Sequence, residues 1–295
     1  MSNANTSPPG NCKFAIPKKG RLYEKVAAML KGSGIDYHRE PRLDVALCAE
    51  FPITLVFLPA ADIAKYVGEG NVDVGITGWD VVQESLVEVE RILDLGFGGC
   101  KLCVQTPVAN NVTDVSTLAG GRIVTSFPEL TKKFFAPLDE EKGVTTKVNF
   151  VSGSVEAACG LGLADAVVDL VETGTTMRAA GLEVSAVVLK TEAILISNPN
   201  SEHKDIVNML KRRLEGYITA TKYVMISYNI SNDLLAGALK MTPGKKSPNI
   251  TPLECGELKA VSALVSKKEA NKRMDELHDL GATDILTFQL TNTRM

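Results

Sequence analysis

The chain has 295 residues, of which 45% are hydrophobic and 23% are charged, a composition that excludes a disordered protein. Its formal net charge of -3 disfavours a general nucleic-acid binder, and apolar runs such as residues 53–61 are too short to span a bilayer. We therefore expect neither nucleic acid nor a membrane as a partner. Any anionic ligand must be met by a local group of basic side chains or backbone amides.

The first two-thirds of the chain alternates short apolar runs with helical patterns, which is typical of an α/β sheet. The pattern predicts helices over residues 22–30 and 60–67 and strands over residues 13–17, 54–58, 72–77, 92–95 and 101–106. A second α/β set follows, with strands predicted over 122–125, 147–151 and 166–171 and helices over 128–136 and 155–163. Residues 185–196 form a long β-branched stretch that can run back out of this second set.

The two sets predict two α/β lobes, joined by crossing segments near residues 99–106 and 187–196. Clefts between lobes are favoured ligand sites, so we expect a ligand between these two. A helix over residues 205–221 then leads to a different pattern, with strands over 223–228, 257–265 and 284–288, helices over 231–239 and 268–280, and a connecting loop over 242–252. This is the β-α-β-β-α-β order of a ferredoxin-like module.

The six cysteines and three histidines are scattered along the sequence. Cys100 and Cys103 form a Cys-x-x-Cys pair that permits a zinc or redox interpretation, but in the predicted strand their side chains face opposite sides. We interpret both as packing residues. Unclustered cysteines do not predict a secreted disulfide scaffold, and residues 1–11 lack a signal pattern, so we expect a cytoplasmic protein.

A candidate phosphate loop follows the predicted buried strand 166–171 and opens a short helix over residues 176–180. Amides at a helix N-terminus favour an anion, and Gly174 lets the backbone approach a ligand closely. Three hydroxyl groups can add donors, those of Thr173, Thr175 and Thr176. Asp169 and Glu172, at the exit of the strand, suit a ligand that also carries hydroxyls, such as a ribose. The alternative is a threonine-capped helix with two solvated carboxylates.

A second candidate site is the strand-to-helix turn that contains Lys18, Gly20 and Arg21. Its side chains can be phosphate donors across the cleft, or a solvated basic patch at the start of a helix. Arg42 is a further candidate of the same kind. Gly78 and Asp80 either belong to the site or form a simple turn with a helix N-cap.

The segment from Glu156 to Met177 resembles the signature of the ATP phosphoribosyltransferase family. The positions that carry the match are Glu156, Gly162, Ala164, Val167, Asp169, Thr173, Gly174, Thr176 and Met177. Residues 16–22, 73–80 and 95–102 resemble motifs of the family's first lobe, and residues 242–244, 247–253 and 277–286 resemble the regulatory domain of its long form. The amino-acid sequences of residues 57–63 and 150–156 most resemble those of fungal or other eukaryotic members. Asn249 departs from the threonine that is usual in the family.

The resemblance implies an α/β fold with two periplasmic-binding-protein-like lobes around a cleft and a C-terminal ferredoxin-like regulatory domain. Catalytic lobe I would comprise residues 1–100 and 192–222, lobe II residues 101–191, and the regulatory domain residues 223–295. It also implies condensation of ATP with 5-phosphoribosyl 1-diphosphate, with Mg²⁺ as cofactor held mainly by substrate rather than by side chains. The product would be N1-(5-phosphoribosyl)-ATP, at the first step of histidine biosynthesis, with feedback inhibition by L-histidine.

The resemblance further assigns the site residues. Asp169 and Glu172 would be catalytic, and phosphoribosyl diphosphate would bind at Asp169, Glu172, Thr173, Gly174, Thr175 and Thr176. ATP and its phosphates would bind at Lys18, Gly20, Arg21, Arg42, Gly78 and Asp80. Histidine would bind at Ser247, Asn249 and Thr251. The assembly would be a homohexamer or a dimer–hexamer equilibrium.

Two other classes fit two lobes around a cleft less well. Solute-binding proteins and ligand-binding transcription regulators need an export signal or a DNA-binding module, and neither is visible in the sequence. A doubly wound phosphoribosyltransferase carries two adjacent acidic residues after an apolar strand, whereas Asp169 and Glu172 are separated.

Overall fold

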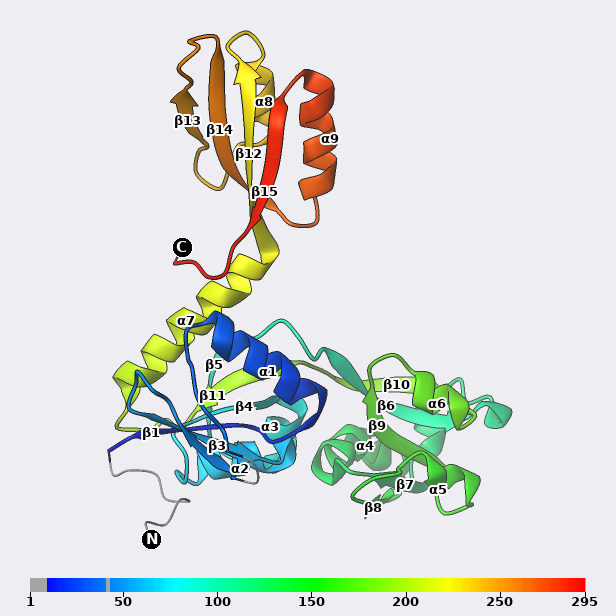
Figure 1. The fold of residues 1–295 in the computed structure, drawn as a ribbon. Helices are drawn as coiled ribbons and strands as arrows, with labels where there is room; N and C mark the ends of the chain where they lie inside the picture. Colours follow the sequence, from blue (N-terminus) through cyan, green and yellow to red (C-terminus); the bar gives the residue numbers. More distant parts are fainter. Residues whose placement is uncertain (1–9, 41–42, 295) are drawn as a thin grey trace. The chain divides into compact units, whose positions relative to one another are not determined.

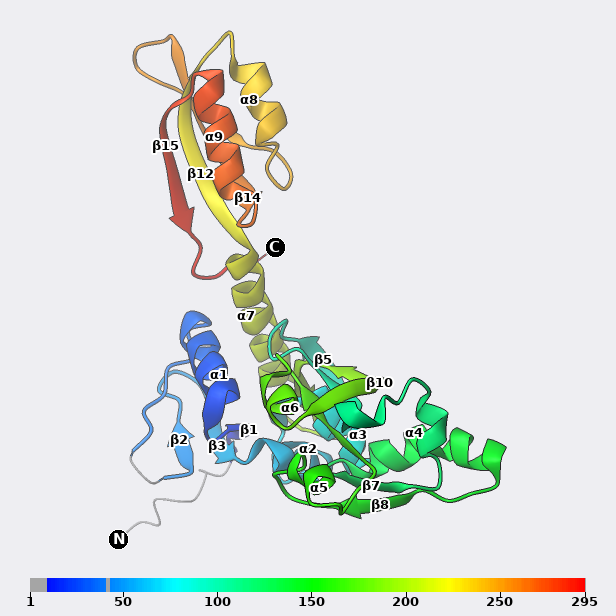
Figure 2. The same cartoon turned by 90° about the vertical axis from the view of Figure 1, so that its right-hand side faces the viewer.

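The computed structural model describes residues 10–40 and 43–294, so the predicted site residue Arg42 lies outside the described residues. The chain divides into two compact units. The first comprises the described parts of Met1–Val26 and Tyr37–Val207, and the second comprises Ala27–Asp36 with the described part of Asn208–Met295. Figures 1 and 2 show the elements of both units. No helix of the described residues is long and apolar enough to cross a membrane.

The first unit contains two sheets, which define two α/β lobes. The six-stranded sheet of the first lobe has the order β2-β3-β1-β4-β11-β5. Its strands are β1 (Cys12–Pro17), β2 (Val45–Leu47), β3 (Ile53–Leu58), β4 (Val74–Gly78), β5 (Glu90–Asp94) and β11 (Ala193–Ser197). Helix α1 (Gly20–Gly32) follows β1, α2 (Ala60–Gly68) follows β3, and α3 (Trp79–Ser85) follows β4. Because β1, β3 and β4 are parallel, their carboxyl ends meet at one edge of the sheet.

The second lobe is built on a five-stranded sheet of order β10-β6-β9-β7-β8. Its strands are β6 (Cys100–Pro107), β7 (Arg122–Thr125), β8 (Lys147–Phe150), β9 (Ala166–Val171) and β10 (Leu182–Thr191). Its helices are α4 (Pro128–Lys142), α5 (Ala157–Gly160), α6 (Thr175–Ala179) and the 3₁₀ turns η1 (Val108–Asn110) and η2 (Val115–Leu118). The apolar core beneath α4 contains Leu102, Ile123, Phe135 and Val168. The predicted two-lobed α/β class is thus confirmed.

The stretch 185–196 runs back out of the second lobe as predicted, as two strands. Strand β10 pairs with β6, and β11 pairs with β4 and β5 of the other sheet. Two helix predictions in this unit were wrong in extent. The helix predicted over 155–163 is only the single turn α5, which is followed by Gly162 with a φ of 70°. The helix predicted over 128–136 continues through Pro137 to Lys142 and ends at Gly143, whose φ is 65°.

The second unit contains helix α7 (Lys204–Lys222) from Asn208 onward and a four-stranded antiparallel sheet of order β13-β14-β12-β15. The strands are β12 (Tyr223–Ser231), β13 (Asn249–Pro252), β14 (Leu258–Ser266) and β15 (Thr283–Gln289). Helices α8 (Leu235–Met241) and α9 (Ala270–Leu280) cover one face of this sheet (Figure 2). The β-α-β-β-α-β order is confirmed, but the loop predicted over 242–252 contains β13, and the helix predicted from residue 231 begins at Leu235.

The C-terminal tail after β15 is held between two helices of the second unit. The Asn292 side-chain amide donates to the carbonyl of Gly32, at the end of α1, at 2.9 Å and to the carbonyl of Arg213, in α7, at 3.3 Å. The Arg213 guanidinium in turn donates to the carbonyl of Gly34 at 2.9 Å. One amide therefore bridges segments that are far apart in the sequence.

Replacing Asn292 with Ala should lower the free energy of unfolding by about 1–2 kcal/mol, because two partly buried carbonyls lose their donor. Thermal denaturation of the full chain measures the effect. Thr291→Ala, at an exposed neighbouring position, is the matched control and should change the midpoint little. Equal midpoints for both variants would show that the bridge contributes nothing.

Candidate active site

A cavity of about 480 Å³ lies between the two lobes of the first unit. The first lobe contributes the β1–α1 turn, with Lys19 and Arg21, and the β4–α3 junction, with Gly78 and Asp80. The second lobe contributes Glu172, directly after β9, together with Leu170, Phe127 and Cys100. The carboxyl ends of parallel strands commonly carry ligand sites in α/β proteins, and here two such edges face one cavity. The cleft predicted from the sequence is therefore present.

An ion pair joins the two lobes at this cavity. The Arg21 guanidinium lies 2.8 Å from the Glu172 carboxylate, and their side chains are 79% and 42% exposed. Exposed ion pairs contribute little to stability because water and salt screen them. Both groups therefore remain accessible to a ligand at little cost in folding free energy.

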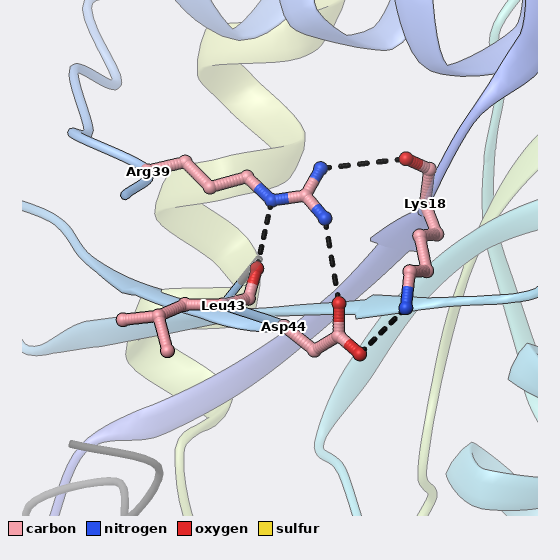
Figure 3. Close-up of polar contacts among 4 residues, drawn as sticks. All are labelled: Lys18, Arg39, Leu43 and Asp44. Carbon is pink, nitrogen blue, oxygen red and sulfur yellow. Dashed lines mark hydrogen bonds and ion pairs between the residues drawn. The ribbon is translucent and has the colours of Figure 1, made fainter. Parts of the chain in front are cut away.

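The side chain of Lys18 does not take part in this ion pair and instead contacts residues of its own lobe. Its ammonium group lies 2.7 Å from Asp44, and the Arg39 guanidinium bonds the carbonyls of Lys18 and Leu43 and the second oxygen of Asp44 (Figure 3). The hydrogen bond from Lys18 is the largest cause that lowers the pKa of Asp44. The structure thus ties Lys18 to its own lobe, while Lys19 lines the cavity. Gly20 starts α1 with a φ of 83°.

Asp80 is 5% exposed and lies in the first turn of α3. Its carboxylate accepts a hydrogen bond of 2.6 Å from the Thr191 hydroxyl, which itself accepts one of 2.9 Å from the Asp80 amide. The N-cap position belongs to Gly78, where any Cβ would overlap the Asp80 carboxylate. Glycine at position 78 therefore allows a buried carboxylate to fold back over the end of β4. A strand-to-helix turn with an N-cap is thus present, and Gly78 rather than Asp80 is the cap.

The predicted phosphate loop joins β9 to α6. Gly174 has a φ of 73° and is the N-cap of α6, so the left-handed conformation that favours glycine is present. The hydroxyls of Thr173 and Thr175 lie 3.0 Å apart. The Arg178 guanidinium folds back onto the loop and donates to the Thr173 carbonyl at 3.0 Å. Thr175 and Thr176 are exposed.

A second cavity, of about 550 Å³, adjoins this loop. Glu172, Thr173 and Gly174 line it, together with three basic residues, Lys101, Arg178 and Lys190. None of these three was singled out in the sequence. Lys101 and Lys190 are register partners across β6 and β10, so only the pairing of two distant strands brings them together. Arg178 lies four residues after Gly174, and the helical spacing was the one signal that could have found it.

Asp169 lies inside β9 and is half-buried. Burial raises the pKa of its carboxyl group, a hydrogen bond from the Leu170 amide opposes this shift, and the negative charge of Glu156 adds to it. The Asp169 backbone carbonyl accepts a hydrogen bond of 3.1 Å from Gln105. Glu172 lines both cavities, whereas Asp169 is not among the described residues that line them.

The three candidate effector residues lie in the second unit and are all exposed. Asn249 and Thr251 belong to the edge strand β13, where they pair with Ser262 and Ala260 of β14. The neighbouring β14 residues Val261, Ala263 and Val265 are buried, so Asn249 and Thr251 lie on the sheet face away from the helices. Ser247 precedes the strand.

The cysteines are free thiols. Cys103 is buried, and Cys100 lines the interlobe cavity, where burial and the charges of Asp80 and Glu172 raise its pKa to about 11. Among residues 10–40 and 43–294, no group of three or more histidine, cysteine or acidic side chains is placed to hold a metal ion.

We expect Cys255, the exposed cysteine, to react first with a thiol reagent at pH 8 in the folded protein. With a pKa of about 11, the Cys100 thiol is ionised to only about one part in a thousand at that pH. Mass spectrometry of partially labelled peptides gives the order of reaction, and labelling in denaturant gives the reference rates. Labelling of Cys100 as fast as Cys255 in the folded state would contradict the buried environment described above.

The fold and the two cavities define a two-lobed α/β protein. Basic side chains and carboxylates line the cavity between its lobes, and a Thr-Gly-Thr turn adjoins the second cavity. Residues 59–216 match the family model described as ATP phosphoribosyltransferase, and residues 220–292 match that of its C-terminal domain. The chain belongs to the ATP phosphoribosyltransferase family, and it is a pentosyltransferase of the first step of histidine biosynthesis.

Relatives and one solved structure support this assignment. The chain is 51% identical to the ATP phosphoribosyltransferase of Yarrowia lipolytica and 49% identical to that of Saccharomyces cerevisiae, in each case over 96% of both chains. The resemblance to fungal members is thus confirmed. The ATP phosphoribosyl transferase (HisG:HisZ) complex of Thermotoga maritima contains a chain with 27% identity and a TM-score of 0.60, covering 70% of this chain and 98% of that one.

Proposed function

We propose that the chain condenses ATP with 5-phosphoribosyl 1-diphosphate to give N1-(5-phosphoribosyl)-ATP and diphosphate. The observation that carries this proposal is the interlobe cavity, where Lys19 and Arg21 of one lobe face Glu172 of the other. Adenine N1 forms a bond to the anomeric carbon, and the bond from that carbon to diphosphate breaks with its electron pair on the leaving oxygen. Both substrates are highly anionic, so an acidic chain needs its basic groups gathered in this way.

The phosphoribosyl group would bind at the loop after β9. The amides at the start of α6, the hydroxyls of Thr173, Thr175 and Thr176, and the close approach allowed by Gly174 would hold its 5-phosphate. The Arg178 guanidinium, already against the loop, adds a positive charge. Glu172 and Asp169 would accept hydrogen bonds from the ribose hydroxyls, with Asp169 acting from within β9.

ATP would bind along the first lobe, at the β1–α1 turn and the β4–α3 junction. Arg21 and Lys19 would contact its phosphates directly, whereas Lys18 would have to leave Asp44 to do so. Gly78, which has no Cβ, leaves the space that the buried Asp80 carboxylate occupies. Arg42 is proposed on its sequence alone.

The chain would contribute positioning and charge stabilisation rather than a strong base. The transition state has oxocarbenium character, so its developing positive charge at the anomeric carbon favours nearby carboxylates such as Glu172. Holding N1 and the anomeric carbon in contact converts a bimolecular step into an effectively unimolecular one. Arg21 can leave Glu172 for a phosphate as substrates enter, which frees the carboxylate for this task.

Magnesium is the proposed cofactor, and when bound it would offset the charge of the leaving diphosphate. The described residues offer only separate carboxylates at the cavity, Asp80 and Glu172, and no cluster of three ligands. Substrate oxygens would therefore supply most of its ligands, consistent with the preference of Mg²⁺ for phosphate oxygens and water.

We propose that residues 1–100 and 192–222 form catalytic lobe I, residues 101–191 catalytic lobe II, and residues 223–295 a regulatory domain that binds L-histidine. The open face of the C-terminal sheet supports the last assignment. The hydroxyls of Ser227 and Ser262 lie 3.0 Å apart there, and Ser262 pairs with Asn249. Amide and hydroxyl groups in one row suit the charged ends of an amino acid. A homohexamer or a dimer–hexamer equilibrium in the cytoplasm is proposed as the working form.

The reaction is tested by mixing the purified chain with ATP, phosphoribosyl diphosphate and Mg²⁺ and following the ultraviolet absorbance. Alkylation at N1 perturbs the adenine chromophore, so absorbance should change only when both substrates are present. No change in the complete mixture would refute the proposed reaction.

Arg21→Ala should lower kcat/KM by about tenfold or more, which corresponds to about 1.4 kcal/mol per tenfold of lost transition-state stabilisation. The melting temperature should stay close to that of the parent, because the Arg21–Glu172 pair is exposed. Lys65→Ala removes another exposed, ion-paired cation outside the interlobe cavity and is the matched control. Near-normal kinetics for Arg21→Ala would return this residue to the solvated-patch interpretation.

The double variant Ser247→Ala, Thr251→Ala should keep its catalytic activity but lose sensitivity to histidine. An effector shifts an equilibrium only through unequal affinity for two states, typically by 5- to 150-fold, so losing contacts should raise the inhibitory concentration of histidine within that range. Ser266→Ala is the matched control, because Ser266 is the last residue of β14 and lies beyond the part of that strand that pairs with β13. Unchanged inhibition in the double variant would place the effector site elsewhere.

A further inference from the structure

The two lobes are also joined by a contact between α3 and α4, which involves none of the residues proposed to bind substrate. Glu84, near the end of α3 in the first lobe, accepts hydrogen bonds of 2.9 Å from the backbone amides of Glu129 and Leu130 in the second lobe. Each carboxylate oxygen takes one amide. The bond is therefore a two-point attachment that fixes direction as well as distance. Figure 2 shows α3 and α4 next to each other.

The partners of Glu84 are the free donors at the start of α4. This helix begins at Pro128, which has no amide hydrogen, and its N-cap residue Phe127 makes no side-chain capping bond. The next two amides, those of Glu129 and Leu130, have no partners within the helix. A carboxylate also interacts favourably with the positive end of a helix dipole. Glu84 thus supplies, from the other lobe, the cap that α4 does not supply itself.

Helix α3 and the residue that precedes α4 line the interlobe cavity. Asp80 and Val81, in the first turn of α3, and Phe127, immediately before α4, are among the lining residues. Asp80 lies four residues before Glu84 and so on the same side of α3. It bonds to Thr191, the last residue of β10 in the second lobe. Helix α3 is therefore attached to the second lobe at both of its ends.

Glu84 has charged neighbours but no cationic partner within ion-pair distance among the described contacts. Burial raises the pKa of its carboxyl group, and the two amide bonds and the charge of Lys132 oppose that shift. Lys132 itself pairs with Glu129 at 2.7 Å. The attachment therefore depends on the two amide bonds rather than on a salt bridge.

We propose that Glu84 is a positioning residue: by capping α4 across the lobe boundary, it holds the loop that contains Gly174 at its working separation from the turn that contains Arg21. The inference rests on the proposed function, since it assumes that one substrate pair bridges these two groups. Without the cap the lobes would populate more open arrangements. The apparent affinity for a bridging ligand falls by the fraction of molecules that remain competent, whereas saturating ligand restores the competent state.

Glu84→Gln is the sharpest test, because the amide keeps the size of the side chain while one of its two oxygens is replaced by a donor. We expect the KM for phosphoribosyl diphosphate and for ATP to rise about tenfold, with kcat within about twofold of the parent. Glu129→Gln is the matched control. It removes a carboxylate at the same helix end but leaves both backbone amides bonded to Glu84, so its KM values should be unchanged.

Two further measurements make the outcomes distinct. Hydrogen exchange of the Glu129 and Leu130 amides should be faster in Glu84→Gln than in the control. Calorimetric titration with phosphoribosyl diphosphate should show a comparable loss of affinity without requiring turnover. A fall in kcat with unchanged KM and affinity would indicate a purely structural role and overturn the proposal, as would equal KM values for the two variants.

The wild-type chain separates this proposal from the proposed reaction. Turnover with both substrates supports the reaction whatever Glu84→Gln does. If the wild type binds phosphoribosyl diphosphate but forms no product, the reaction is refuted, and the difference in affinity between Glu84→Gln and Glu129→Gln decides the role of Glu84. If the wild type binds no phosphoribosyl diphosphate, both proposals fail.

Discussion

The insertion of β11 between β4 and β5 is the constraint on which the first unit depends. The chain leaves the six-stranded sheet after β5, builds the second lobe, and returns as β11, which pairs antiparallel with both strands. Its five residues are all buried. The two lobes are consequently joined by two crossing segments, and the sheet of the first lobe is incomplete until the second lobe has been made.

The charged side chains near the cavity form ion pairs that leave them at least partly exposed to solvent. Arg21 and Glu172 form an ion pair in which the arginine is largely exposed and the glutamate is partly exposed, and Lys18 forms a partly exposed ion pair with Asp44. In contrast, the groups that carry the geometry are buried or half-buried. Asp80 with Thr191 is one such group, and Glu84 at the amides of α4 is another. Exchangeable ion pairs would then serve binding, and fixed hydrogen bonds would hold the lobes.

The sequence predicted those features of the fold and the site that depend on neighbouring residues in the chain. Apolar periodicity located most strands, and the Thr-Gly-Thr turn predicted a glycine at the start of a helix, where Gly174 is the N-cap of α6. The sequence did not predict contacts between segments that are far apart in the chain. Lys190 reaches the candidate phosphate loop only through the pairing of β10 with β6, and Glu84 meets α4 only through the packing of α3. The short edge strand β13 was missed because its four exposed residues, read alone, look like loop.

The central claim is that this cavity joins adenine N1 to the anomeric carbon of a phosphoribosyl group. Its most direct test is the identity of the product formed from ¹⁵N-labelled ATP, phosphoribosyl diphosphate and Mg²⁺. Mass spectrometry should show ATP increased by one phosphoribosyl unit, and nuclear magnetic resonance should show coupling between the labelled N1 and the anomeric proton. Attachment at any other nitrogen, or release of diphosphate without a new nucleotide, would contradict the account.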